Sequence, residues 1–261
     1  MIDVLISVGT IGISCFYHDS AVCLIDKEGN ILAAVQEERF SRQKHDARFP
    51  ICSLAYCVNQ AKKLNIEITG YVYYEKPIRV FLRLIETYLK CSPRGFSSFL
   101  PAMQSWLSEK LFMSDKIEEI ISIVDDNFKP EKLYFSDHHL SHASAAFFPS
   151  PFEEAAVLCM DAVGEFATTT VWHGKGNELT QLWKIDFPCS IGLLYSAFTY
   201  YCGFKVNSGE YKLMGLAPYG EPKFVSKIKD FLIDIKDDGT FKLDISYFKF
   251  HRGFRMTNNK F

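Results

Sequence analysis

The stretch GTIGISCFYHDSAVCLIDKEGNILAAVQEERF, residues 9–40, is typical of three consecutive β-strands. Its apolar runs are separated first by the polar turn YHDS and then by the segment KEGN. The Gly29-Asn30 pair in the second of these favours the positive φ angles of a tight hairpin. The stretch therefore predicts a strand meander at the start of the fold.

The same pattern returns in AAVLCMDAVGEFATTTVWHGKGNELTQLWKI, residues 155–185, where Gly176-Asn177 would form the matching hairpin. When the two Gly-Asn pairs are superposed, Asp161 aligns with Ser14 and Glu165 with His18. This weak internal repeat predicts two related halves that each open with a meander. We place their boundary between residues 153 and 154.

Helix-like segments follow each meander, which favours an α/β fold. The second half ends in a mixed aromatic and basic tail with no helix to close its sheet, so we expect that half to be incomplete. The expected helices are residues 51–64, 95–113, 115–128, a helix from the histidines near 138 to 145 or 147, 190–204 and 221–235, with a short strand at 132–137 and a loop at 206–220.

Composition narrows the class of protein. Apolar residues make up 48% of the 261-residue chain, which is ample for a buried core. The net charge of -2 argues against nucleic acid or an anionic membrane as a partner, and favours small molecules. Eight cysteines without a CxxC pair are typical of reduced, buried thiols in a cytosolic protein.

The apolar N-terminus, MIDVLISVGTIGISCF, has no basic residue before Lys27 and is interrupted by Asp3. A secretory signal would carry a basic region ahead of its apolar run. We therefore interpret this segment as a buried strand. No other segment reaches the roughly 18–20 apolar residues of a membrane span, so we expect a soluble cytoplasmic protein.

The segment DHHLSHASAAFFPSPF, residues 137–152, places His138 and His142 four positions apart. On a helix capped by Ser136 or Asp137 these two imidazoles share one face, whereas His139 is turned by about 100°. Such a pair can bind one metal ion, and the simpler alternative is two helix-end histidines bonded to the backbone.

Asp161 ends an apolar strand and opens the turn DAVGE, so its carboxylate would emerge at a strand edge. Two imidazoles and a carboxylate suit iron(II), zinc or manganese. An ordinary Asx turn explains Asp161 equally well. His18, in the matching turn FYHDSA, is either a solvated side chain or a general base facing a cleft.

Two further segments are candidates for anion binding. Arg39, Arg42, Lys44 and Arg48 form a basic run, which is either a solvated face balanced by neighbouring acids or a phosphate site. The glycine-rich segment NSGEYKLMGLAPYG does not match a Walker P-loop, yet its single lysine could meet a phosphate.

Four segments in this order, residues 12–50, 137–152, 160–169 and 207–220, closely resemble the carbamoyltransferases of the nodulation-factor and antibiotic-tailoring type. The resemblance covers nearly the whole chain. It implies a duplicated actin-like (ribonuclease H-like) α/β fold that is related to the tRNA threonylcarbamoyl transferases. It also implies an enzyme that carbamoylates a substrate hydroxyl, using carbamoyl adenylate made from carbamoyl phosphate and ATP.

By motif, the resemblance gives each candidate residue a role. His138, His142 and Asp161 would bind a divalent metal, with iron preferred over zinc or manganese. His18 would remove the hydroxyl proton. The residues near the ATP-derived adenylate would be Gly164, Glu165, Gly209, Glu210 and Lys212.

Two features depart from the family pattern. Ala162 stands where the family typically has glycine, and the chain is about half as long as a full member. We therefore expect this chain alone to be inactive in the complete reaction, and to self-associate through uncovered apolar faces. Two alternatives remain open: a non-catalytic actin-like module that binds nucleotide or metal, and an unrelated HxxxH metal-dependent hydrolase.

Overall fold

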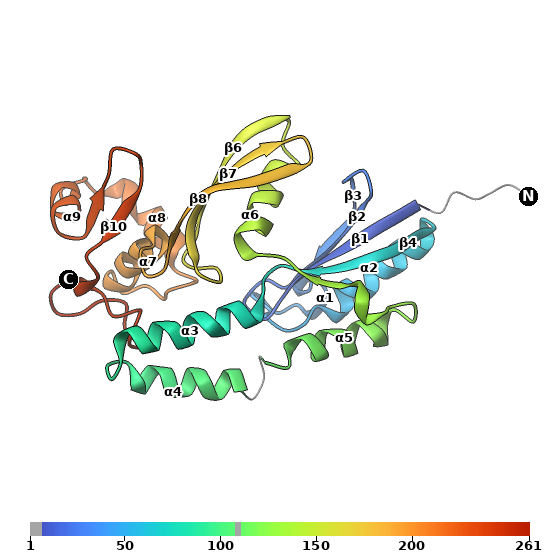
Figure 1. Cartoon of the computed structure of the whole chain (residues 1–261), viewed down its shortest axis with the longest axis horizontal. Helices are drawn as coiled ribbons and strands as arrows, with labels where there is room; N and C mark the ends of the chain where they lie inside the picture. Colours follow the sequence, from blue (N-terminus) through green and yellow to red (C-terminus); the bar gives the residue numbers. More distant parts are fainter. Residues whose placement is uncertain (1–6, 108–110) are drawn as a thin grey trace, which may run out of the picture. The chain divides into compact units, whose positions relative to one another are not determined.

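The structure is a computed structural model that describes residues 7–107 and 111–261 (Figure 1). The parts of the expected N-terminal strand and of the expected 95–113 helix that fall on residues 1–6 and 108–110 lie outside the described residues. The chain divides into two compact units, Met1–Pro77 with Ser108–Ser141 and Ile78–Leu107 with His142–Phe261. The boundary predicted between residues 153 and 154 separates two copies of a sequence repeat. The division into compact units does not test that repeat, so the boundary stays a prediction.

The first unit contains a mixed five-stranded sheet whose strand order is β3-β2-β1-β4-β5. The first three strands form the predicted antiparallel meander, with Gly29 at φ 86° in the hairpin. β4 and β5 extend the sheet in parallel with β1. The strands are β1 (Ser7–Ser14), β2 (Ala21–Asp26), β3 (Ile31–Gln36), β4 (Ile66–Tyr73) and β5 (Leu133–Phe135).

Helices α2 (Ile51–Lys63) and α5 (Met113–Val124) pack with this sheet, close to the ranges that their apolar spacing predicts. Ile11 and Leu24 from the strands are fully buried together with Ile117 from α5. The buried carboxylate of Glu37 accepts hydrogen bonds from the N-terminal residues of α2, Cys52 and Ser53. Short helix α1 (Glu38–Ser41) follows β3, and a 3₁₀ helix (Pro130–Lys132) precedes β5.

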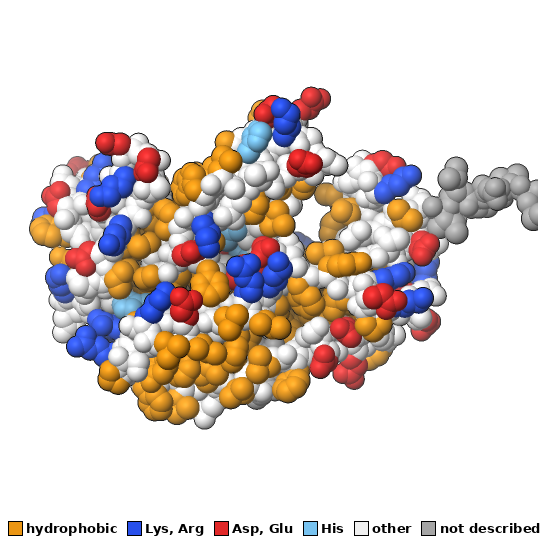
Figure 2. Space-filling model, viewed as in Figure 1, with side chains coloured by type: hydrophobic (Ala, Val, Ile, Leu, Met, Phe, Trp, Pro, Cys, Tyr) orange, Lys and Arg blue, Asp and Glu red, His pale blue; other side chains and the backbone are white. Residues whose placement is uncertain are grey.

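Residues 77–105 form two helices, α3 (Pro77–Cys91) and α4 (Phe96–Ser105). The sequence patterns predicted no element over the stretch that holds β4 and α3, and a single helix over residues 95–113, where α4 and the start of α5 lie. Figure 2 shows hydrophobic side chains gathered over α3 and α4. On α3 they recur at helical spacing, with Ile78 68% and Leu89 67% exposed. This apolar surface fits the expected self-association, which stays a prediction.

Helix α6 (His138–Phe147) contains the three clustered histidines, as predicted, and the division between the units falls inside it, after Ser141. In the second unit, β6 (Glu154–Met160), β7 (Ala167–Lys175) and β8 (Glu178–Asp186) form the second predicted antiparallel meander. Gly176 occupies its hairpin at φ 57°.

Helix α7 (Ile191–Tyr201) begins as predicted, because the Ser190 side chain accepts a hydrogen bond from the backbone of Leu193. The C-terminal part differs from expectation in two places. The segment expected as a loop contains helix α8 (Glu210–Leu216), followed by a 3₁₀ helix (Ala217–Tyr219). The expected 221–235 helix is shorter, α9 (Val225–Phe231), and the chain then enters a strand.

That strand, β9 (Ile233–Ile235), pairs with β10 (Phe241–Leu243). β-Branched Ile233 and Ile235 favour an extended backbone, and pairing with the next strand across a short turn overrides the helical pattern of the preceding residues. Phe248, after a last 3₁₀ helix (Ile245–Tyr247), is fully buried in the core formed with α7.

All eight cysteines are free thiols, and Cys15, Cys57 and Cys159 are buried. Burial raises the pKa of Cys57 to about 11, which disfavours the reactive thiolate. Among the helices of the described residues, none has the length and apolarity that crossing a membrane requires.

Candidate metal centre

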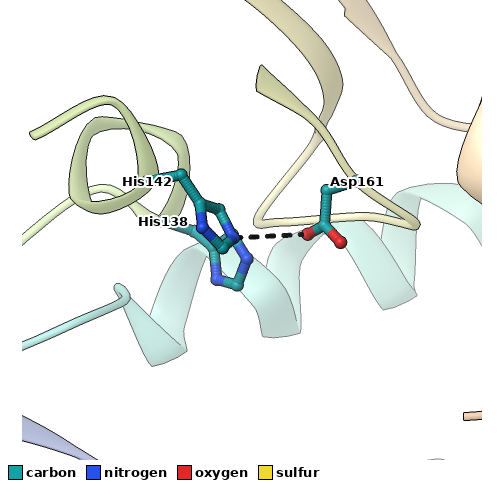
Figure 3. Close-up of side chains that lie close together, drawn as sticks. All are labelled: His138, His142 and Asp161. Atoms are coloured by element: carbon teal, nitrogen blue, oxygen red, sulfur yellow. Dashed lines mark ion pairs between the residues drawn. The ribbon is translucent and has the colours of Figure 1, made fainter. Parts of the chain in front are cut away.

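His138 and His142 stand one turn apart on α6, and Asp161 follows β6 directly. One candidate ligand atom from each of the three residues lies within 4.8 Å of the other two. Figure 3 shows both imidazoles beside each other, with the His142 ring directed at the Asp161 carboxylate. His139, which the helical spacing predicts to point away from this pair, is buried and only 3% exposed. The structure therefore brings together the three residues that were predicted as ligands.

The Asp161 carboxylate is oriented by its own turn. One of its oxygens, Oδ1, accepts a hydrogen bond of 2.7 Å from the backbone N–H of Ala162. The other, Oδ2, lies 3.9 Å from Nε2 of His142. The Asx-type contact and the ligand geometry are thus compatible, because they use different oxygens. The backbone of the turn is fixed as well, since Asp161 donates to Thr168 and accepts from the Ser190 hydroxyl.

His138 has a carboxylate on its Nδ1 side. Oε2 of Glu75, two residues after β4, lies 3.6 Å from this nitrogen, and the His138 side chain is only 15% exposed. The ring also packs edge-on against Tyr74, with centroids 5.6 Å apart. A carboxylate beside the second nitrogen of a ligating histidine fixes the orientation of the ring and raises its basicity. Glu75 was not among the predicted site residues, because β4, the strand that precedes it, was not predicted.

Helix α6 is fixed against the second sheet by a close contact at its C-terminal end. The Phe147 ring packs on Gly174 of β7, and a β-carbon at position 174 would lie 2.7 Å from ring atoms. Phe147 is 3% exposed, so the ring has little room to move. This contact holds the helix that carries His142 against the sheet that carries Asp161.

His18 lies in the first unit, in the turn between β1 and β2, and its side chain is 51% exposed. Its Nδ1 is 2.9 Å from a carboxylate oxygen of Asp19, and His45 contacts the other oxygen at 3.1 Å. The turn is held in an unusual backbone conformation, with Phe16 at φ 69° and Asp19 at φ 50°. Such conformations cluster at functional sites. Asp19 follows His18 directly in the sequence, yet its orienting role was not predicted.

Gly164 and Glu165 lie in the turn after Asp161. The Gly164 backbone donates to Ala167, and its carbonyl accepts a hydrogen bond from the Arg83 guanidinium. Glu165 is 5% exposed. This turn is thus rigid and partly enclosed.

Gly209 and Glu210 begin α8, and the Glu210 carboxylate folds back onto the helix start. It accepts hydrogen bonds from the backbone of Asn207 and Gly209 and from the Ser196 hydroxyl on α7. Although partial burial raises the pKa of Glu210, these hydrogen bonds outweigh it and leave the pKa below its ordinary value. The Lys212 ammonium lies 5.9 Å from the centroid of the Tyr211 ring.

The basic run after β3 is largely balanced by acids. Arg48 makes two hydrogen bonds to the buried Asp46, and Arg39 lies 3.8 Å from Glu38. These contacts match the solvated and paired alternative, and we assign no ligand to this run.

The ligand types of His138, His142 and Asp161 fit a divalent metal ion. Nitrogen and carboxylate ligands on a helix and a strand end are the combination that iron(II), zinc and manganese accept. That they bind an ion stays a prediction.

Comparison with known proteins supports the resemblance. The profile of the family described as "Carbamoyltransferase N-terminus" matches residues 9–261. An uncharacterized protein of Synechocystis sp., sll1178, is 57% identical over 253 residues, which cover 96% of this chain and 41% of that protein. Nodulation protein NolNO of Sinorhizobium fredii is 32% identical, over 87% of this chain and 32% of its own length. The chain therefore belongs to the carbamoyltransferase N-terminus family.

An uncharacterized protein of Methanocaldococcus jannaschii, MJ1058, is also similar, with 28% identity over 81% of this chain and 42% of that protein. The chain thus spans well under half the length of each of these three relatives.

Proposed function

We propose that this chain is the carbamoyl-transferring N-terminal part of an O-carbamoyltransferase. The observation that carries the proposal is the convergence of His138, His142 and Asp161 in a chain whose family is defined by carbamoyl transfer. The donor would be carbamoyl adenylate, made from carbamoyl phosphate and ATP, and the acceptor a hydroxyl of a small molecule.

The fold that we propose is a duplicated actin-like fold. Its support is the recurrence of an antiparallel three-strand meander, β1-β2-β3 in the first unit and β6-β7-β8 in the second. Each meander carries candidate site residues in the turn after its first strand, His18 in one and Asp161 in the other.

The three predicted ligands would hold one divalent ion, preferably iron. When bound, the ion would supply Lewis-acid polarisation of a donor oxygen. His142 and Asp161 are 54% and 30% exposed in their side chains, so a substrate could approach from their side. His138 is more enclosed, and Glu75 would hold its ring in the binding orientation.

His18 would act as general base toward the acceptor. With Nδ1–H donating to Asp19, a neutral His18 ring presents Nε2 as its basic atom. As the acceptor oxygen forms its bond to the carbamoyl carbon, the hydroxyl proton would pass to Nε2. The bond between the carbamoyl group and the adenylate phosphate would break, and AMP would leave with its electron pair.

Gly164, Glu165, Gly209, Glu210 and Lys212 would face the adenylate. Lys212 is suited to contact a phosphate as a point charge. Glu210 is already engaged with the start of α8, so its part would be to hold Gly209 and the helix in place rather than to contact the ligand.

The direct test uses a full-length family member that carries the same FYHDSA turn. Substitution of the residue equivalent to His18 by asparagine should lower carbamoyl transfer by roughly 10² or more, the usual scale for loss of a general base. ATP-dependent consumption of carbamoyl phosphate should continue. Equal loss of both steps would contradict a role confined to transfer.

The chain by itself provides a second test. Incubated with carbamoyl phosphate, ATP and hydroxyl acceptors, it should yield no carbamoylated product by mass spectrometry, because activation needs a second site with its own phosphate-binding residues. If this chain forms product without a second protein, the site that activates carbamoyl phosphate lies within these 261 residues, which would contradict the proposal.

A further inference from the structure

The second unit contains a cavity of about 380 Å³, and none of the three predicted metal ligands lines it. Its walls come from α3, from α4 and the turn between them, from Val163 and Leu193, and from the C-terminal segment 250–254. The turn and the C-terminal segment are in close contact, because a β-carbon at Gly95 would lie 3.2 Å from Cβ of Arg252. The volume lies near the lower end of the range of small-molecule sites.

The charged side chains that line this cavity are all basic. Arg83, Arg94 and Arg252 line it, and no aspartate or glutamate does so among residues 7–107 and 111–261. Within the same described residues, Arg94 and Arg252 form no ion pair. The Arg83 guanidinium is held by the carbonyl of Gly164. Three guanidinium groups without a lining carboxylate create a positive potential that favours an anion.

His251 adds a polar atom whose partner is missing from the described structure. Its Nδ1 is buried and has no hydrogen-bond partner. Burial, together with the neighbouring Arg252, lowers the pKa of His251 to about 4, so the ring is neutral at pH 7. A buried polar atom of this kind is costly unless a partner is provided. A ligand in the cavity is one such partner.

The remaining wall is aromatic. Tyr88 and Phe99 are stacked with ring centroids 4.0 Å apart and an interplanar angle of 9°. Phe250 and the 77% exposed Phe254 also line the cavity. This wall offers apolar surface to a ring or chain that is attached to the anionic group.

We propose that this cavity binds a small phosphomonoester whose organic group is aromatic. A phosphate carries about −1.5 to −2 charges at pH 7 and three acceptor oxygens, which three arginines can satisfy. A carboxylate has one charge and two oxygens, and so would leave part of the positive field unbalanced. The proposal does not depend on the transfer chemistry proposed above, although Val163 in the cavity wall belongs to the same turn as Gly164.

Phenyl phosphate is a suitable probe, and calorimetry on the 261-residue chain at low salt measures its binding. Wild-type chain should bind it at least tenfold more tightly than benzoate or inorganic phosphate. Arg94→Glu, a change at an exposed side chain, should weaken binding by more than tenfold. The matched control is Lys227→Glu on α9, which makes the same charge change outside the cavity and should bind like wild type.

Thermal melting of both variants shows whether each remains folded. Failure of the wild-type chain to bind phenyl phosphate would overturn the proposal. So would equal weakening by Arg94→Glu and Lys227→Glu, since that result would indicate only nonspecific attraction. Inorganic phosphate binding as tightly as phenyl phosphate would overturn the aromatic part.

Cys91 provides a readout that is independent of affinity. It lines the cavity, whereas Cys202 is exposed elsewhere in the same unit. Saturating phenyl phosphate should slow alkylation of Cys91 severalfold, measured by peptide mass spectrometry, and leave Cys202 unchanged. If phenyl phosphate leaves the alkylation rate of Cys91 unchanged, or slows Cys91 and Cys202 by the same factor, the ligand does not bind in the cavity.

Discussion

Gly192 on α7 packs against the peptide that joins Asp161 to Ala162. A β-carbon at position 192 would lie 2.7 Å from the carbonyl oxygen of Asp161 and 2.7 Å from the nitrogen of Ala162. Real β-carbons do not approach backbone atoms this closely, and these are backbone atoms that cannot swing aside. The position of Asp161 therefore depends on the absence of a side chain at residue 192.

We expect Gly192→Ala to displace the Asp161 turn and to lower both stability and metal content. Overpacking of this kind costs about 1–3 kcal/mol. Urea denaturation measures the first effect and elemental analysis of the purified chain the second. Gly215→Ala is the control, because a β-carbon at that position would have no neighbour within 4 Å and alanine favours the helix that contains it. Equal results for the two variants would contradict the close packing.

Gly174→Ala should be destabilising by about 1–3 kcal/mol, because its new methyl group would meet the buried Phe147 ring. The second change Phe147→Leu removes the ring and should recover part of that loss. A double-mutant cycle in urea measures the coupling. Additive effects of the two substitutions would show that the ring and the glycine do not constrain each other.

Tyr71→Phe should lower the free energy of unfolding by about 1–3 kcal/mol, the cost of leaving a buried polar group without its donor. The Tyr71 hydroxyl donates a 2.6 Å hydrogen bond to Asp125, which is 5% exposed. Tyr134→Phe, at a side chain that is 54% exposed, serves as the control and should stay within about 0.5 kcal/mol of wild type. A neutral result for Tyr71→Phe would mean that Asp125 finds another donor.

The pH dependence of stability should reveal the Asp46–Arg48 pair. Hydrogen bonds from the Arg48 guanidinium, with a further one from Ser41, hold the pKa of Asp46 well below its usual range. Because the pKa is lower in the folded chain, this pair contributes stability above the unfolded value of about 3.9, and the contribution is lost as the pH falls through the folded value.

Arg48→Gln should therefore be less stable than wild type near neutral pH, and the difference should begin to shrink below about pH 4. Urea denaturation at a series of pH values from neutral down to about 3 measures it, with Lys44→Gln as an exposed control. A difference that stays constant throughout, or that grows toward acid, would contradict the sign of the shift.

The parts of the fold predicted from sequence rest on local signals. Both meanders follow from alternating apolar runs and Gly-Asn turns, and Gly29 and Gly176 adopt the positive φ angles that those turns require. The shared face of His138 and His142 follows from one helical turn, and the place of Asp161 at a strand end follows from the apolar run before it. That the three residues form one site was expected from the family resemblance.

The parts of the fold that were not predicted depend on side-chain contacts and strand pairings that residue patterns alone do not reveal. The glycine-rich segment around 209 is typical of a loop, yet Glu210 folds back to accept hydrogen bonds at the start of α8. Ile233 continues the pattern of a helix and instead pairs with Leu243. Gly192 lies in a run of helix-forming residues, so only the position of Asp161 reveals its role.

The metal content of the purified chain tests the central claim most directly. Prepared without chelator and without oxygen, then loaded with iron(II) and freed of excess metal, the wild-type chain should retain about one divalent ion per molecule by plasma mass spectrometry. His142→Ala should retain less than a tenth of that amount at unchanged thermal stability. The matched control His173→Ala, at a histidine paired with Glu154 on the same sheet as β6, should retain the wild-type amount. Retention of wild-type metal by His142→Ala would contradict the proposed centre.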